Sequence, residues 1–130
     1  MTAMAVQLNH TIVASRDKQA AARFVTELFG LADPVPFGPF LAVALDNDVT
    51  LDYIDSDDVI VSQHYAFLIS ESDFDEIYGK IRERDLPHWA DPAQNRPGAI
   101  NTNDGGRGVY FHDLDGHYLE IITRPYGSGG

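Results

Sequence analysis

The feature that most constrains this chain is an internal repeat. Residues 8–15 (LNHTIVAS) align with residues 62–69 (SQHYAFLI), and this alignment places His10 on His64. Both segments alternate between two faces, as a β-strand does. A repeated unit of this size does not bury its apolar face alone, so the repeat predicts two related modules that pair with each other.

A second match joins the ends of the two modules. Residues 49–54 (VTLDYI) align with residues 117–122 (HYLEII), which places Asp52 on Glu120. Two histidines and two carboxylates therefore occupy equivalent positions of the repeat. Core packing gives no reason for this coincidence, whereas a shared site does.

In each module an amphipathic helix follows the first strand. The first helix is expected over about residues 17–29, with Ser15 as its cap and Gly30 as its stop. The second is expected to begin after Ser70 and to end near Arg84.

The remaining strands complete the pattern. Residues 40–45 and 49–54 predict two strands around an acidic turn, and residues 109–112 and 117–123 predict a closing hairpin. These segments account for two strands after each helix. We interpret the chain as two copies of strand, helix and three strands, which predicts an α+β fold of two βαβββ modules with a curved, mostly antiparallel sheet.

Length and composition limit the alternatives. The 130 residues predict one domain, 1–130, with modules at about 6–56 and 60–126. Nine basic and twenty acidic residues give a net charge of −11, which disfavours nucleic acid and anionic membranes as partners. With no cysteine, any metal site must use nitrogen and oxygen ligands.

The amino terminus bears on localisation. Residues 1–6 lack the basic and apolar regions of a secretory signal, and no apolar run approaches the roughly 20 residues of a membrane span. The protein is therefore expected in the cytoplasm.

Two segments read as irregular. Residues 88–108 form the longest irregular stretch and predict a lid, and the glycine-rich tail 126–130 is expected to be mobile. His88 is expected on a loop surface, and His117 faces away from Glu120 in a strand of period two. These histidines and His112 are left out of the ligand set.

Two segments resemble a known family. They are LNHTIVA with the helix end ELFGL, and GVYFHDLDGHYLEIITRPYG at residues 108–127. The chain resembles the vicinal oxygen chelate superfamily of glyoxalases, bleomycin-resistance proteins and extradiol dioxygenases over nearly its whole length. The resemblance implies a cup-shaped sheet with the helices outside, a divalent metal at its centre and a homodimer.

The resemblance also implies the ligands. His10, His64 and Glu120 match the family's ligand positions, and Asp52 occupies a fourth position where relatives often carry glutamate. The shorter arm of Asp52 leaves three readings open: direct ligation, binding through water, or support of another ligand. Two imidazoles and a carboxylate suit Fe, Mn, Co, Ni or Zn.

Two classes of function follow. The first is a metal-dependent lyase, isomerase or dioxygenase, whose metal chelates two neighbouring oxygens of a small molecule while Glu120 or Asp52 moves a proton. A dioxygenase needs only three ligands, so it is favoured if Asp52 does not coordinate. A thiol transferase of the fosfomycin-resistance type finds no convincing match to its basic substrate-binding residues. The substrate-binding candidates are Phe40, Trp89, Arg107 and Tyr110.

The second class is a metal-free protein that sequesters a drug or another small molecule, as bleomycin-resistance proteins do. The acidic surface and aromatic residues such as Phe37 and Phe40 would suit a cationic, planar ligand. The retained ligand set argues against this class.

Overall fold

A computed structural model describes residues 4–129. The first three residues of the amino-terminal stretch and the last residue of the tail lie outside this range. The chain divides into two compact units, Met1–Ile60 and Val61–Gly130, and each unit is described by itself.

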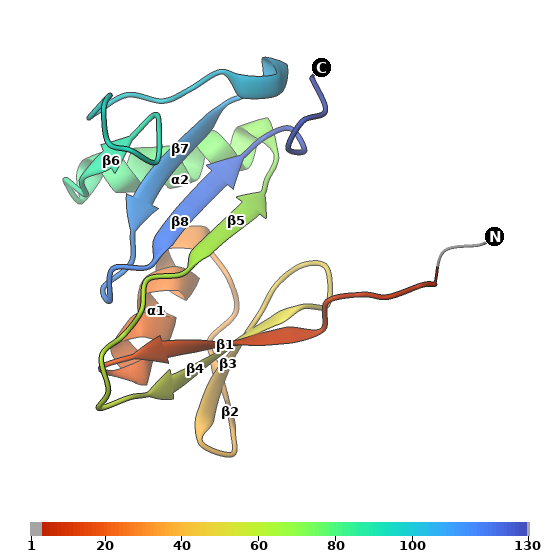
Figure 1. Cartoon of the computed structure of the whole chain (residues 1–130), viewed down its shortest axis with the longest axis vertical. Coiled ribbons are helices and arrows are strands. Elements are labelled where there is room, and N and C mark those ends of the chain that lie inside the picture. Colours follow the sequence, from red (N-terminus) through yellow and green to blue (C-terminus); the bar gives the residue numbers. More distant parts are fainter. Residues whose placement is uncertain (1–3, 130) are drawn as a thin grey trace. The chain divides into compact units, whose positions relative to one another are not determined.

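The first unit has the order strand, helix and three strands (Figure 1). Its sheet has the order β1-β4-β3-β2, in which β1 is parallel to β4 and the other two pairings are antiparallel. The elements are β1 (His10–Ser15), α1 (Lys18–Phe29), β2 (Val35–Phe37), β3 (Phe40–Ala44) and β4 (Thr50–Asp55).

The second unit repeats this topology. Its sheet has the order β5-β8-β7-β6, again with one parallel pairing, between β5 and β8. The elements are β5 (His64–Leu68), α2 (Glu71–Glu83), β6 (His88–Trp89), the 3-10 turn η1 (Asn103–Gly105), β7 (Gly108–His112) and β8 (Tyr118–Ile122). The predicted pair of βαβββ modules is confirmed, as two four-stranded sheets that are each mostly antiparallel.

The repeat extends to the strand register. Asp52 of β4 lies opposite Ile12 of β1, and Glu120 of β8 lies opposite Ala66 of β5. Each carboxylate is therefore paired with the residue two positions after the histidine of its own unit. Because side chains alternate along a strand, each histidine and its carboxylate share one face of their sheet.

Helix capping differs from the expectation at one end. Asp17, not Ser15, caps α1, and its side chain accepts from the backbone N–H groups of Gln19 and Ala20. Ser15 is the last residue of β1, and its hydroxyl donates to the Ile54 carbonyl. Gly30 ends α1 in the left-handed conformation, φ 66°, as predicted.

The cap of α2 agrees with the prediction. The Ser70 hydroxyl accepts from the backbone N–H of Asp73, and the helix ends before Arg84.

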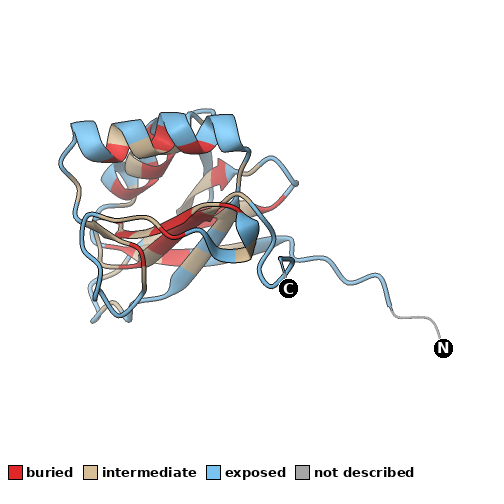
Figure 2. Cartoon of the chain, turned by 90° about the horizontal axis from the view of Figure 1, so that it is seen from above, coloured by how far each residue is buried: buried red, intermediate tan, exposed pale blue. Residues whose placement is uncertain are grey.

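Each helix buries one side and exposes the other (Figure 2). In the first unit α1 packs against β1, β3 and β4. The face of the first sheet that carries His10 and Asp52 leaves Ile12 and Phe37 exposed, and the equivalent face of the second sheet leaves Leu68 exposed. The core of the first unit contains Val13, Ala21, Ala22, Val25, Leu28, Val43, Leu51 and Tyr53, and that of the second Phe74, Ile77, Ile81, Val109, Phe111, Leu119 and Ile121.

Each sheet ends in a short edge strand, and one of them, β6, lies in the stretch 88–108 that the sequence predicts to be irregular. Pro36 sits in the middle of β2, at the edge of its sheet, where a missing backbone N–H is tolerated. His88 belongs to β6 and not to a surface loop: its Nδ1 lies 2.9 Å from the Leu86 carbonyl and its Nε2 3.2 Å from the Tyr78 hydroxyl.

No helix within residues 4–129 has both the length and the apolar character that crossing a membrane would need.

Candidate metal centre

The second unit brings two of the predicted ligands into contact. His64 Nε2 lies 3.0 Å from Glu120 Oε1. The two side chains come from neighbouring parallel strands, and the longer arm of glutamate spans the offset of two positions between them. This contact presents a nitrogen donor and an oxygen donor together on the open face of the sheet.

Neighbouring side chains shield the glutamate. The Glu120 side chain is only 9% exposed and that of His64 is 51% exposed, because β8 lies between β5 and β7. Tyr110 stands directly across from Glu120 on β7, with its ring centroid 5.9 Å from that of His64. Burial, followed by the charge of Glu120 and a hydrogen bond with it, raises the pKa of Tyr110 to about 12. The phenol is therefore protonated at neutral pH and serves Glu120 as a donor.

The first unit arranges its equivalent pair differently. Asp52 is buried, and its Oδ1 accepts a hydrogen bond from the Thr50 hydroxyl at 3.0 Å. His10 is exposed, and its Nδ1 lies 2.7 Å from Asn9 Oδ1. The side chain of aspartate is one methylene shorter than that of glutamate, and Asp52 is held by Thr50, a residue of the same strand. Among residues 4–129, His10 has no carboxylate contact like that between His64 and Glu120.

The donor set fits a divalent transition metal by its chemistry. Imidazole nitrogen and carboxylate oxygen are the ligands such ions take in the absence of cysteine. Within residues 4–129 no group of three acidic or histidine side chains forms a metal cluster. The predicted ligands are divided between the two units, with His10 and Asp52 on the first and His64 and Glu120 on the second.

The aromatic candidates also lie on these faces. Phe40 is half-buried on β3, on the same face as Asp52 by alternation. Trp89 pairs with Tyr110 across β6 and β7, and its ring lies 5.2 Å from the ring of His112. His112 in turn lies 4.4 Å from the Tyr118 ring, so it belongs to an aromatic cluster.

His117 is a core residue. It is 1% exposed, and its Nδ1 accepts from the backbone N–H of Gln63. Its omission from the predicted ligand set agrees with this placement.

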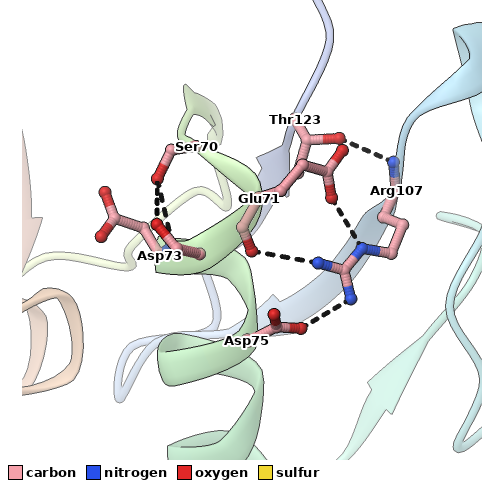
Figure 3. Close-up of polar contacts among 7 residues, drawn as sticks. Ser70, Glu71, Asp73, Asp75, Arg107 and Thr123 are labelled. Atoms are coloured by element: carbon pink, nitrogen blue, oxygen red, sulfur yellow. Dashed lines mark hydrogen bonds and ion pairs between the residues drawn. The ribbon is translucent and has the colours of Figure 1, made fainter.

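Arg107, a predicted substrate-binding residue, is held by the second helix. Its guanidinium bonds to Glu71 Oε1 and Asp75 Oδ1, both at 2.8 Å, and to the Glu71 carbonyl (Figure 3). It also lies 4.4 Å from the centre of the Phe74 ring. Because Arg107 directs its side chain toward the helix, its charge is committed to α2.

A pocket of about 400 Å³ opens beside the glutamate within the second unit. Several of its residues were missed in the sequence, because they lie in the irregular stretch and in the tail that was expected to be mobile. The lining residues are Asn101, Asn103, Asp104, Arg107, Tyr110, Glu120, Ile122, Arg124, Tyr126 and Gly127.

Known proteins resemble the chain over most of its length. No family profile matches it. It is 30% identical to "Glutathione transferase FosA" of Serratia marcescens over 125 residues, which cover 91% of this chain and 81% of that protein. The chain belongs to the vicinal oxygen chelate superfamily.

Solved structures of this superfamily and its relatives agree. "Oxidase ChaP-H1" is 63% identical, covers 95% of this chain and 99% of its own, and superposes with a TM-score of 0.93. A glyoxalase/dioxygenase from Nostoc punctiforme is 25% identical and superposes with a TM-score of 0.69. The match covers 92% of this chain and 91% of that one. The predicted family and fold of this vicinal oxygen chelate protein are thus confirmed.

Proposed function

We propose that this protein is a metal-dependent oxidase of a small organic molecule, with the ion held by His10, His64 and Glu120. The observation that carries the proposal is the 3.0 Å contact between His64 Nε2 and Glu120 Oε1 on an open sheet face. The equivalent position of His10 in the repeat supplies the third donor.

Asp52 is assigned a supporting role. Its carboxylate is engaged by Thr50, and its arm is shorter than that of Glu120. Two histidines and one carboxylate leave coordination positions open, which is the arrangement used by non-haem iron oxygenases. When bound, such an ion would chelate two neighbouring oxygens of the substrate and support chemistry with dioxygen.

The choice of oxidation among the possible reactions is supported by the relatives. Oxidase ChaP-H1 shares 63% of its sequence with this chain over nearly the full length of both. The likeness to the glutathione transferase is much lower, at 30%. Within the site, Tyr110 holds a proton toward Glu120 and so orients this carboxylate.

The proposed active form is a homodimer in which each site takes His10 from one copy and His64 and Glu120 from the other. The open face of the first sheet supports this arrangement, because it leaves Ile12 53% exposed and Phe37 69% exposed. Pairing open faces between copies would cover these side chains.

Metal uptake tests the proposal. Purified protein, loaded anaerobically with Fe(II), is expected to bind about one ion per chain, and nitric oxide is expected to give the paramagnetic signal of an iron site with an open position. His64→Ala and Glu120→Ala should lose the ion. Asp52→Asn should keep it.

The matched control is His88→Ala, since His88 is hydrogen-bonded to Tyr78 away from the ligands. If the wild type takes up no Fe, Mn, Co, Ni or Zn, the oxidase proposal is wrong and a metal-free binding protein remains. If Asp52→Asn loses the ion as Glu120→Ala does, the three-ligand site is wrong.

A further inference from the structure

The pocket beside Glu120 is also lined by the tail segment that follows β8. Glu120 and Tyr110 line this pocket from β8 and β7, and Arg124 and Tyr126 line it from the tail. We propose that the tail forms a binding subsite for an aromatic ligand that carries an anionic oxygen group, such as an aromatic carboxylate. The inference rests on the proposed function in that this ligand would be the substrate of the same site.

The tail is held in place by Asp104. The carboxylate of Asp104 accepts hydrogen bonds from the backbone N–H of Gly127 at 3.0 Å and from that of Gly129 at 3.1 Å. Asp104 itself has a left-handed backbone, φ 58°. A Cβ at Gly129 would overlap the backbone of Asp104, so only glycine allows this close approach. The tail is therefore a fixed wall of the pocket.

A second close approach positions Arg124. Gly106 is buried, and a Cβ on it would lie 2.5 Å from Cγ of Arg124. The stem of the arginine thus packs on the backbone of the loop before β7. This packing holds the aliphatic part of the Arg124 side chain in place and leaves its guanidinium to bind another partner.

The charge of Arg124 is not used within the part of the chain described, where no ion pair involves it. Arg107, the other arginine of the pocket, is paired with Glu71 and Asp75. An arginine beside a pocket in a chain of net charge −11 selects for a negatively charged ligand, because the guanidinium fork matches a carboxylate.

The aromatic part of the ligand is assigned to Tyr126. Its side chain is 94% exposed although the tail is tethered, so both ring faces are available for stacking. Ile122 adds an apolar surface to the same pocket. The negative charge of Glu120 disfavours an anion beside it. The acidic group of the ligand is therefore assigned to Arg124, and the ring to the part of the pocket lined by Tyr126 and Ile122.

Calorimetric titration with 2-naphthoate and its neutral counterpart 2-naphthamide tests the subsite. The full chain is titrated with its metal bound and again after removal of the metal by a chelator. We expect Arg124→Gln to weaken 2-naphthoate binding about tenfold or more and to abolish the preference for the acid over the amide. Tyr126→Leu should weaken both probes to the same extent.

Asp104→Ala, which releases the tail, is expected to act like the two substitutions combined. The control is Arg96→Gln, which removes an equal charge from an exposed loop of the same unit and should change nothing. The inference is overturned if Arg124→Gln binds 2-naphthoate as the wild type does, or if Arg96→Gln weakens it equally.

The metal content of each sample separates the two proposals. If the protein binds no metal and Arg124→Gln still loses the preference for the acid, the subsite is supported and the oxidase proposal is contradicted. A full metal site with no effect of Arg124→Gln would do the reverse.

Discussion

Glu120 owes its properties to two neighbours on adjacent strands. His64 contacts its Oε1 from β5, and Tyr110 faces it from β7. A buried carboxylate needs such partners, because an ionised group without them is strongly disfavoured away from water. The same two contacts orient the carboxylate toward the open face.

Removal of the Tyr110 hydroxyl tests this orientation. Tyr110→Phe is expected to weaken metal binding by about 10- to 100-fold, as loss of a group that orients a ligand usually does. Competition with a chelating dye measures the affinity. Tyr118→Phe is the matched control, since that hydroxyl donates to the Pro92 carbonyl and not to Glu120. Equal losses in both variants would contradict the assigned role.

The buried carboxyl of Asp113, in the turn between β7 and β8, is expected to make the stability of the fold depend on pH. Its Oδ1 accepts from the backbone N–H groups of Asp115 and His117, and its Oδ2 is buried without a hydrogen-bond partner among residues 4–129. Burial raises the pKa of this carboxyl above its usual value. The folded state then binds a proton more readily than the unfolded state, so the contribution of Asp113 to stability grows as the pH falls through the raised pKa.

Asp113→Asn keeps the acceptor and removes the buried charge. We expect it to unfold at higher urea concentration than the wild type at pH 7, with an advantage that shrinks as the pH is lowered. Asp113→Ala loses both hydrogen bonds and should cost about 1–3 kcal/mol of the free energy of unfolding. An Asn variant that is less stable than the wild type by the same amount at every pH would refute this account.

At the scale of elements, α2 is joined to β7 by Arg107. The guanidinium bonds to the first turns of the helix, while the backbone N–H of Arg107 donates to the Thr123 hydroxyl (Figure 3). Hydrogen bonds with Thr123 and then with Arg107 lower the pKa of Glu71. A lowered carboxyl pKa contributes stability above the unfolded-state value, and this contribution is lost as the pH falls through the folded-state value.

Arg107→Met is therefore expected to lower the melting temperature at pH 7 by about 2–6 °C, since the ion pairs are partly exposed. The difference from the wild type should be smaller at pH 3 than at pH 7, because the contribution of Glu71 is lost as the pH falls through its lowered pKa. Differential scanning calorimetry at both pH values measures the change, with Arg96→Met as the exposed control. A difference that is the same at pH 3 would assign the effect to packing on Phe74.

At the scale of the whole molecule, the proposed ligands lie on both units, and the proposed site draws them from two chains. His10→Ala and Glu120→Ala each destroy one half of the site. In a mixed dimer, one of the two sites would then receive both defects and the other would be intact.

Mixing equal amounts of these two variants, after dissociation and reassembly, should restore metal binding to about a quarter of the wild-type amount, because half of the dimers are mixed and each has one intact site. Metal analysis after gel filtration measures the recovery. His10→Ala mixed with His64→Ala should recover equally. No recovery in either mixture would place each site within one chain.

The sequence by itself determined the repeat and most of the elements. Alternation in residues 8–15 and 62–69, helical periodicity and the Ser70 and Gly30 signals are local, so they can be read without the fold. The alignment of the two halves of the sequence is also enough to pair His10 with His64 and Asp52 with Glu120. The alignment predicted equivalent positions for these residues in the two modules, and the strand register confirms this equivalence.

Only the tertiary structure decided what these residues touch. Asp17 and not Ser15 caps α1, since Ser15 donates to a carbonyl 39 positions away. Arg107 binds a helix 32–36 positions earlier, and Asp104 holds a tail 23–25 positions later. Such contacts depend on strand register and on close approaches of backbone at glycine, which are set by the packing of distant segments and leave no periodic pattern in the sequence.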